Sequence, residues 1–156
     1  MSGVDEKAIG GHGVFVGRHP HSLDSKRRVT IPSDWRAQVG MPQGFYVLPG
    51  IDQKCLCAFP AAEMFRRMEK MRQHSFTDAR ARQFARVLAS QSELLEWDSQ
   101  GRIRIKDDLL NFAGLVDQVE LIGTFDSFEL WNPDHLQQSG ALDRSNLQEA
   151  ARYMEF

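Results

Sequence analysis

Apolar and charged residues alternate in two short stretches of the chain, which is the pattern of a half-buried β-strand. The alternation runs through Arg102-Ile103-Arg104-Ile105-Lys106 and through Arg28-Val29-Thr30-Ile31. Turn-forming residues precede each stretch, at 24–26 and at 98–101. Each stretch therefore predicts a strand that is entered through a tight turn and has one polar and one apolar face.

The two stretches belong to longer segments that align with each other. The segment from Asp24 to Leu48 matches the segment from Asp98 to Ile122 at a constant offset of 74 residues, and Pro60 matches Pro133 at an offset of 73. Both copies show the same order of turn, strand, short helix, glycine and strand. The chain is therefore predicted to contain one β-turn-β-helix-β-β unit twice.

Each copy also carries signals for the ends of its elements. Ser33 and Asp107 are expected to cap two helices of about two turns, and Gly40 and Gly114 are expected to follow them. A unit of about 45 residues is too small to bury a stable core alone, so the copies are expected to pack around a shared pseudo-twofold axis. The strands predicted after the helices are 45–48, 56–59, 119–122 and 128–131.

Between the copies, the apolar periodicity changes to that of a helix. Two apolar stripes predict two helices, the second capped by Thr77 or Asp78, and the tail from Ser145 predicts another. A methionine-rich stripe is typical of core packing or of a contact between subunits more than of a cofactor site. The stripes consist of Met64, Phe65, Met68 and Met71, and of Ala81, Phe84, Ala85 and Leu88.

The composition of the 156 residues narrows the class of protein. An apolar share of 42% and a charged share of 26% exclude long disorder and low-complexity character. No apolar run approaches the roughly 18 residues of a membrane span, and no signal-peptide pattern is present at the start. Two cysteines, Cys55 and Cys57, cannot form a disulfide framework, so a cytoplasmic location is expected.

The net charge of −2 conceals an uneven distribution. Residues 1–92 carry 14 basic and 8 acidic side chains, whereas residues 93–156 carry 5 basic and 13 acidic ones. This asymmetry indicates either a field that attracts polyanions or head-to-tail packing, in which the basic face of the helical insert meets the acidic half of a neighbouring subunit. Two alternatives remain. The basic face of the insert is then simply solvated, or the uneven charge distribution has no functional meaning.

The phrases LDSKRRVTIP and DSQGRIRI resemble the DxxxR signature of the MraZ family, which contains two tandem SpoVT-AbrB-type repeats. The likeness covers about Val14 to Gln137 and includes an FxG start at Phe15-Val16-Gly17 and an SFELW run that ends at Trp131. It implies an α+β fold, in which two tandem AbrB-like swapped-hairpin repeats form one pseudo-twofold β-barrel with peripheral helices.

The resemblance also implies a function. Family members are bacterial transcription regulators that associate with the nucleoid, bind repeated sites upstream of the division and cell-wall gene cluster, and form rings. We therefore expect double-stranded DNA as partner, a homo-oligomer, no membrane, no small-molecule substrate and no cofactor. The expected organisation is a flexible tail at 1–13, repeats at 14–60 and 93–137, a helical insert at 61–92 and a helical tail at 138–156.

Cations at the two turns supply the candidate DNA contacts. Arg28 is expected to read a guanine edge through two parallel hydrogen bonds, worth ~1–3 kcal/mol of base discrimination. Asp24 is expected to orient Arg28, and Asp98 to orient the matching Arg102. Because the second half is acidic, the first copy is expected to dominate binding. The further cations expected to contact DNA, mostly at phosphates, are Lys26, Arg27, Arg18 and Arg104.

The sequence departs from the family pattern at two positions. Arg27 stands where the family has a turn glycine, as Gly101 does in the second copy. Glycine adopts a positive φ there without steric cost and arginine does not, so the first turn is either reshaped or presents an additional cation. Val16 also replaces an arginine that is common in the FxG motif.

Other functions have weaker support in the residues. Cys55-Leu56-Cys57 and His19-Pro20-His21 offer four zinc-ligand side chains, but their spacing is not that of structural zinc sites, so packing thiols and no metal are expected. No phosphate loop, nucleophile elbow or zinc helix is present, so no enzyme is expected. An oligomeric protein-binding scaffold and an antitoxin of the AbrB-like fold remain as alternatives.

Overall fold

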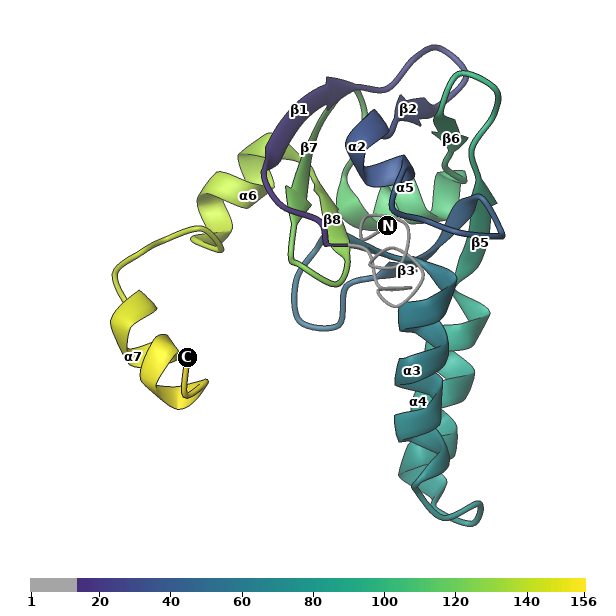
Figure 1. The fold of residues 1–156 in the computed structure, drawn as a ribbon, viewed down its shortest axis with the longest axis vertical. Coiled ribbons are helices and arrows are strands. Elements are labelled where there is room, and N and C mark those ends of the chain that lie inside the picture. Colours follow the sequence, from purple (N-terminus) through teal and green to yellow (C-terminus); the bar gives the residue numbers. More distant parts are fainter. Residues whose placement is uncertain (1–13) are drawn as a thin grey trace, which may run out of the picture.

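The structure is a computed structural model that describes residues 14–156, so the flexible tail expected at 1–13 lies outside the described residues. The described chain has a mixed α+β fold with antiparallel strands (Figure 1). The strands are β1 (Arg18–Ser22), β2 (Arg28–Thr30), β3 (Gly44–Pro49), β4 (Leu56–Phe59), β5 (Glu93–Glu96), β6 (Arg102–Arg104), β7 (Gln118–Gly123) and β8 (Phe128–Trp131). The helices are α2 (Ser33–Arg36), α3 (Ala61–Arg72), α4 (Ala79–Ser90), α5 (Asp107–Ala113), α6 (Pro133–Ser139) and α7 (Leu147–Tyr153).

The strands form a six-stranded sheet and a separate two-stranded ribbon. The sheet has the order β1-β7-β8-β4-β3-β5, and the ribbon consists of β2 and β6. Strands from the two halves pair with each other, β1 with β7, β3 with β5, β4 with β8 and β2 with β6. The pairing is symmetric between the halves. If β1, β2, β3 and β4 change places with β5, β6, β7 and β8 in that order, the same four pairs result. Each half therefore completes the sheet of the other half.

One hydrophobic core serves both halves. Val29 and Ile103 lie opposite each other in the middle of the ribbon and are fully buried. Phe15, Trp35 and Phe128 pack nearby, with ring centroids 4.8–5.7 Å apart. Because these aromatic rings come from both halves, burial of the core depends on the halves folding together.

Most of the predicted elements are confirmed. β4 and β8 have the predicted bounds, and β3 and β7 contain 45–48 and 119–122. The insert forms the two helices α3 and α4, and Asp78 caps α4 by accepting hydrogen bonds from the backbone N–H groups of Arg80 and Ala81. The tail contains α7, and α6 precedes it.

The ends of the two short helices differ from the prediction. α2 has only four residues and its C-cap is Ala37, so Gly40 lies three residues beyond the cap. The N-caps are Pro32 and Lys106, and neither side chain caps its helix, so Ser33 and Asp107 are first helical residues rather than caps.

The C-cap of the second short helix agrees with the prediction. α5 spans seven residues and ends at Ala113, and its C-cap is Gly114, whose φ of 64° is left-handed. However, the strand predicted up to Lys106 already ends at Arg104, because Lys106 is the N-cap of α5. Lys106 is therefore not part of a strand face shared with Arg102 and Arg104.

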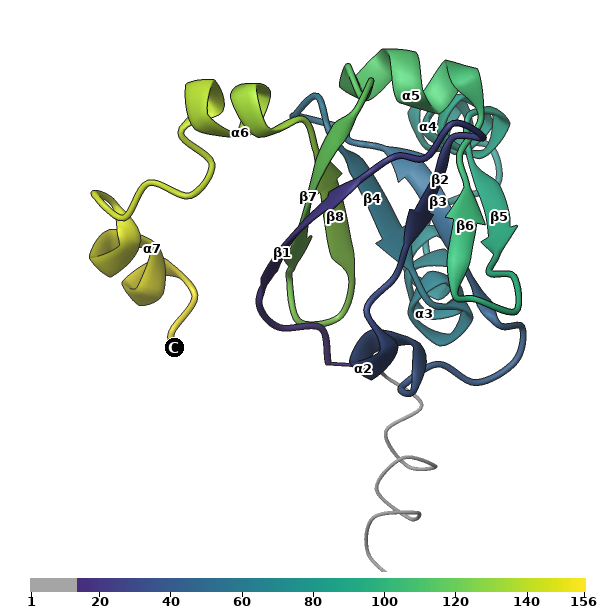
Figure 2. The same ribbon diagram turned by 90° about the horizontal axis from the view of Figure 1, so that it is seen from above.

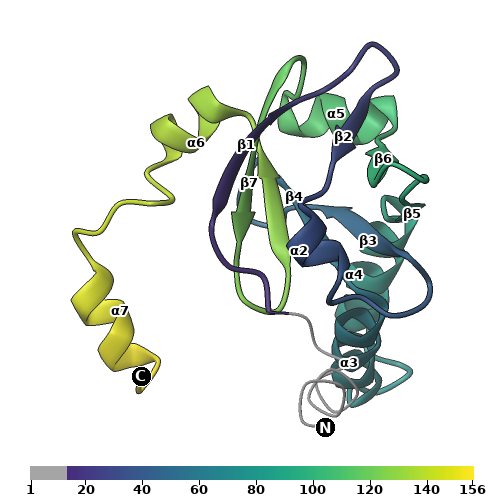
Figure 3. The same cartoon turned by 45° about the horizontal axis from the view of Figure 1, so that its top comes forward.

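Two features project from the β-structure (Figure 1). The antiparallel helices α3 and α4 extend away from it, at the opposite end from the β1–β2 connection. No residue of α4 is buried, and in α3 only Ala61 and Glu63 are, so most of the hairpin lies outside the core. α7 stands apart from the β-structure, at the end of the segment that follows α6 (Figure 3). None of the described helices is long and apolar enough to cross a membrane.

Candidate nucleic-acid interface

The ribbon of β2 and β6 has one exposed face, which we call the ribbon face. Val29 and Ile103 point into the core, and side chains alternate along a strand, so their neighbours point outward. Figure 2 shows β2 and β6 side by side and antiparallel, with their preceding turns at opposite ends. The ribbon face consists of Arg28, Thr30, Arg102 and Arg104.

At the first turn, the Asp24 carboxylate holds Arg28 in place. Its Oδ1 accepts the backbone N–H groups of Lys26 and Arg28, each at 2.9 Å, and its Oδ2 accepts Nε of Arg28 at 2.7 Å. The backbone hydrogen bond from Arg28 is the main reason that the pKa of Asp24 lies below its usual range. The expected orienting contact is therefore present, and the carboxylate is ionised at neutral pH.

The second turn repeats this arrangement. Asp98 Oδ1 accepts the backbone N–H groups of Gln100 at 2.9 Å and Arg102 at 3.0 Å, and Oδ2 accepts Nε of Arg102 at 2.9 Å. The backbone hydrogen bond from Arg102 lowers the pKa of Asp98. Nη1 of Arg28 also lies 3.9 Å from Asp98 Oδ2. Both arginines therefore converge on the Asp98 carboxylate.

The guanidinium groups of Arg28 and Arg102 are fixed by hydrogen bonds but are not buried. Each side chain is 25% exposed, and each uses its Nε for the carboxylate of its own turn. Within residues 14–156, no side chain or carbonyl accepts a hydrogen bond from their terminal nitrogens. Two parallel donors on each arginine are thus left for a planar acceptor pair, such as the major-groove edge of guanine.

The two turns have the same backbone shape although their residues differ. Arg27 has a φ of 60°, and Gly101 has a φ of 79°. The arginine therefore adopts the left-handed conformation, and of the two expected alternatives the additional cation is the one observed. Nε of Arg27 lies 3.1 Å from Asp107 Oδ1, and the arginine side chain is 55% exposed.

A cation near the second turn comes from a different part of the chain. Arg36 on α2 donates a hydrogen bond from Nε to the Ile31 carbonyl at 3.0 Å. Its guanidinium lies against Gly101, so that a Cβ at this glycine would overlap it. The repeat does not indicate Arg36, because the aligned residue of the second copy is Leu110, which is buried.

Arg18 lies away from the ribbon face. It begins β1, whereas the first turn follows Ser22 at the other end, about 13 Å along the strand at ~3.3 Å per residue. Nη2 of Arg18 binds Glu120 Oε1 on β7 at 3.0 Å. The structure therefore does not bring Arg18 together with Arg28, although the two are close in sequence.

Arg104 extends the positive charge toward the first turn. It lies opposite Arg28 in the ribbon, is exposed, and within the described chain has no carboxylate at ion-pair distance. Lys106 pairs with Glu93 at 2.7 Å, and this hydrogen bond raises the pKa of Lys106. A pocket of about 560 Å³ at this end is lined by Arg27, Glu93, Arg104, Ile105, Lys106, Asp107 and Asp108.

The zinc ligands considered from the sequence are not brought together. His19 on β1 packs edge-on against Trp35, with ring centroids 5.0 Å apart. Cys55 and Cys57 lie at β4, where a third donor comes from Glu129 on β8. No sequence pattern indicates this third residue, because its placement depends on the pairing of β4 with β8.

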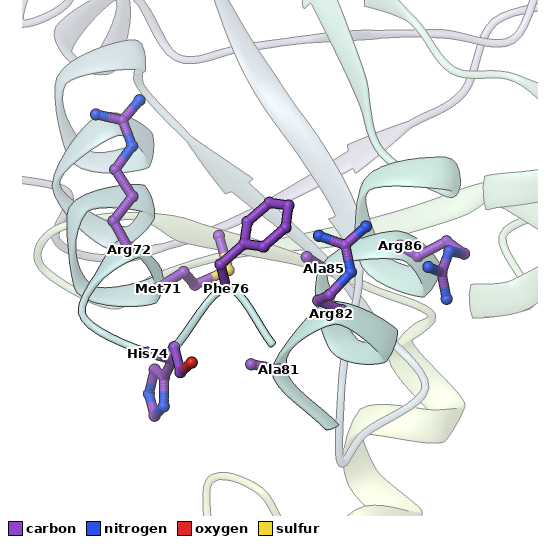
Figure 4. A pocket seen from close by; sticks show the side chains of 9 residues that line it. Met71, Arg72, His74, Phe76, Ala81, Arg82, Ala85 and Arg86 are labelled. Carbon is purple, nitrogen blue, oxygen red and sulfur yellow. The ribbon is translucent and has the colours of Figure 1, made fainter. Parts of the chain in front are cut away.

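A second cationic surface lies on the α3–α4 hairpin. A pocket of about 580 Å³ lies between the end of α3 and the start of α4, and Figure 4 shows the side chains that line it. Phe76 is 81% exposed there, and the Arg82 guanidinium carbon lies 4.8 Å from the centre of its ring. The labelled side chains around the pocket are Met71, Arg72, His74, Phe76, Ala81, Arg82, Ala85 and Arg86.

Comparisons with known proteins find one family. Residues 88–154 match the family model described as "MraZ protein, putative antitoxin-like". Three curated relatives are each named "Transcriptional regulator MraZ". The relative from Finegoldia magna is 34% identical over 125 residues, which cover 80% of this chain and 85% of the relative. The relative from Natranaerobius thermophilus is 34% identical over 139 residues, or 87% and 95% of the two chains. The relative from Acetivibrio thermocellus is 37% identical over 119 residues, or 76% and 81%.

Proposed function

Because the chain belongs to the MraZ family of transcriptional regulators, we propose that its ribbon face binds repeated DNA sites upstream of the division and cell-wall gene cluster. The observation that carries the proposal is the paired Asp–Arg arrangement, in which each arginine is oriented by a carboxylate and donates no hydrogen bond from its terminal nitrogens within residues 14–156. An oriented arginine loses less conformational entropy on binding than a mobile one.

The shape of the ribbon fits this role. A major groove about 12 Å wide admits a two-stranded β-ribbon, whose strands are ~4.8 Å apart. In the proposed complex Arg28 and Arg102 read base edges, and Lys26, Arg27 and Arg104 hold phosphates. Arg36 adds positive charge at the second turn. Arg18 is left out of the contact surface, because it pairs with Glu120 at the far end of β1.

We also propose that the sheet and the ribbon are parts of one pseudo-twofold barrel of two tandem AbrB-like swapped-hairpin repeats. The exchange of strands between the halves supports this proposal, because each strand pair has a counterpart when the halves are interchanged. In such an arrangement the pseudo-symmetry relates the first turn, with Asp24 and Arg28, to the second turn, with Asp98 and Arg102. We call these the two Asp–Arg turns, and both belong to a single DNA-binding surface.

The proposed active form is a homo-oligomer, the ring that the family resemblance implies, and it acts at the nucleoid. A single ribbon face offers few cations and would bind weakly at physiological salt, whereas several linked ribbons meeting tandem DNA repeats multiply the apparent affinity. The α3–α4 hairpin is the proposed contact between subunits, since its apolar side chains Phe65, Phe84 and Val87 are exposed and its cations complement the acidic second half.

Native mass measured over a range of salt concentrations tests this contact. Dissociation of the oligomer at high salt supports pairing between the basic hairpin and the acidic half, because ionic screening weakens exposed charge pairs. An assembly that is indifferent to salt contradicts it.

The DNA-binding proposal is tested by titrating the chain with its own upstream DNA and with a shuffled sequence of equal length. We expect at least tenfold tighter binding to the upstream DNA, a footprint over the repeats, and an affinity that falls steeply with salt. Equal affinity for both DNAs contradicts sequence-specific binding, and the absence of any DNA shift favours the protein-binding scaffold.

An antitoxin is the second candidate, and the description of the matching family model favours it. This function requires a toxin partner that binds the chain stoichiometrically. The two repeats fused in one chain count against it, because antitoxins of this fold usually build the barrel from two chains. Isolation of a stoichiometric protein complex that does not bind the upstream DNA would support the antitoxin.

A further inference from the structure

Two cysteines and a glutamate meet where the two halves of the chain pair. Cys57 on β4 lies directly opposite Glu129 on β8. Cys55 comes two residues before Cys57, and alternate residues of an extended segment share one face. The donor atoms of the three side chains lie within 4.8 Å of one another.

The surroundings hold this cluster in place. Cys55 is 1% exposed and packs with Ile122, Trp131 and Leu136, while Cys57 and Glu129 are half-buried. The indole N–H of the buried Trp131 donates a hydrogen bond to Glu129 Oε1 at 2.9 Å. A hydrogen bond of this kind orients a metal-binding carboxylate in many metal sites.

The cluster has no cation of its own in the described part of the chain. No Lys, Arg or His side chain of residues 14–156 lies within ion-pair distance of Glu129, and no donor except Trp131 reaches its carboxylate. The Arg67 guanidinium also acts electrostatically on Cys57, but it is already paired with Glu63 at 2.8 Å and with Asp126 at 3.2 Å. A half-buried carboxylate beside two sulfur atoms is therefore left to bind another cation.

We propose that Cys55, Cys57 and Glu129 form a binding site for a thiophilic divalent cation of the Zn²⁺ type. Two thiolates and a carboxylate oxygen are ligands that Zn²⁺ accepts, and a water molecule would complete the tetrahedron. Zn–S bonds of about 2.3 Å place two sulfur atoms about 3.8 Å apart, so small side-chain rotations bring the donors to this spacing.

Ion binding joins the two halves of the fold. β4 belongs to the first half and β8 to the second, so the ion adds coordinate bonds across their shared edge. The two thiols release their protons to solvent as the metal–sulfur bonds form, and no electron is transferred. Because the unfolded chain lacks the preformed site, bound ion stabilises the folded chain.

The test uses the full chain, reduced and freed of metal with a chelator, and titrates it with Co²⁺ as a spectroscopic probe. We expect one ion per chain, intense thiolate-to-metal absorption, tetrahedral d–d bands, and displacement by Zn²⁺. We also expect Zn²⁺ to protect both thiols from alkylation and to raise the melting temperature. A Co²⁺ spectrum without thiolate absorption, or with the weak bands of octahedral coordination, overturns the proposal.

Variants separate coordination from general charge effects. Glu129→Gln is expected to weaken Co²⁺ binding at least tenfold, and Cys57→Ser to reduce the thiolate absorption and weaken binding at least a hundredfold. The matched control is Glu96→Gln, which removes the same charge from an exposed position on β5 and should leave binding unchanged. Wild-type affinity in folded Glu129→Gln overturns the assignment of the third ligand. If Cys57→Ser fails to fold, the spectrum of the wild-type chain and the Glu129→Gln titration still decide the matter.

Discussion

The two Asp–Arg turns have the same hydrogen bonds but different charges. In each, one carboxylate accepts two backbone N–H groups and one arginine Nε. The first turn carries Lys26 and Arg27 between these residues, whereas the second carries Gln100 and Gly101. The spacing from aspartate to arginine therefore sets the geometry, and the residues between them set the local charge.

At the second turn, part of the positive charge that the turn residues lack is supplied by Arg36 of α2. Arg36 lies against Gly101, in space that a side chain at this position would occupy. The first turn has the larger number of its own cations, and it belongs to the half with excess basic residues. We therefore expect two arginines of similar geometry to contribute unequally to DNA binding, with the first dominant.

The largest expected effect comes from removing the arginines one at a time. Arg28→Ala should abolish the preference for the upstream DNA, a loss of about tenfold to a hundredfold, because a bidentate contact to guanine is worth ~1–3 kcal/mol. Arg102→Ala should lose less. Competition titrations with specific and shuffled DNA measure both losses, and native mass confirms unchanged assembly. Wild-type discrimination in Arg28→Ala would show that this arginine does not read the sequence, and equal losses would remove the inequality between the turns.

The next prediction compares how much Asp24 and Asp98 each contribute to specific DNA affinity. Asp98→Asn should lower specific affinity more than Asp24→Asn, because Asp98 lies near both Arg28 and Arg102, whereas Asp24 contacts only one of these two arginines, Arg28. Asparagine keeps an acceptor oxygen but loses the charge that orients the guanidinium. The same competition titration measures the order of the two variants. The reverse order would contradict the convergence of both arginines on Asp98.

A reciprocal pair of substitutions tests the turn backbone. Arg27→Gly should stabilise the chain by about 0.5–1 kcal/mol, because glycine adopts the observed φ of 60° without strain. Gly101→Ala should destabilise it by ~1 kcal/mol or more, because the new Cβ overlaps Arg36 at a φ of 79°. Urea unfolding midpoints measure both. Destabilisation by Arg27→Gly would mean that the Arg27–Asp107 pair outweighs the backbone strain.

Arg27→Gly also tests the charge difference directly. If Arg27 holds a phosphate, its loss should reduce the salt dependence of binding by about one unit of slope and leave sequence preference nearly unchanged. Affinity measured at several salt concentrations gives this slope. An unchanged slope would show that the cation particular to the first turn does not contact DNA.

The smallest expected effect is on pH dependence. The pKa values of Asp24 and Asp98 are lowered in the folded chain, so their contribution to stability is fully present above the ordinary aspartate pKa of about 3.9. It is lost as the pH falls through the lower, folded pKa values. In the double variant Asp24→Asn/Asp98→Asn, the urea midpoint should therefore fall less between pH 6 and pH 3 than in the wild type. An identical fall in both proteins would contradict the role of these carboxylates.

Local patterns in the sequence predicted most of the fold. The spacing of Met64, Met68 and Met71 predicts α3, and the alternation around Val29 and Ile103 predicts both strands of the ribbon and their buried sides. The contacts from Asp24 to Arg28 and from Asp98 to Arg102 could also be predicted, because each joins residues only four positions apart across a turn.

Contacts between distant segments could not be predicted in this way. Arg36 reaches Gly101 only because the halves exchange strands, and Glu129 meets Cys57 only through the pairing of β4 with β8. Arg18, in contrast, is close to the first turn in sequence but distant from it in space, because the extended strand β1 separates them. Proximity along the chain is a poor guide to proximity in space once a strand intervenes.

If the ribbon face enters the major groove, methylation interference should detect it. Methyl groups on guanine N7 project into the major groove at the acceptor that an arginine would use. We predict that methylation of particular guanines in the upstream repeats blocks binding of the wild-type chain, and that Arg28→Ala no longer distinguishes methylated from unmethylated sites. Wild-type binding that is unaffected by N7 methylation, but is abolished by a minor-groove ligand, would contradict the account.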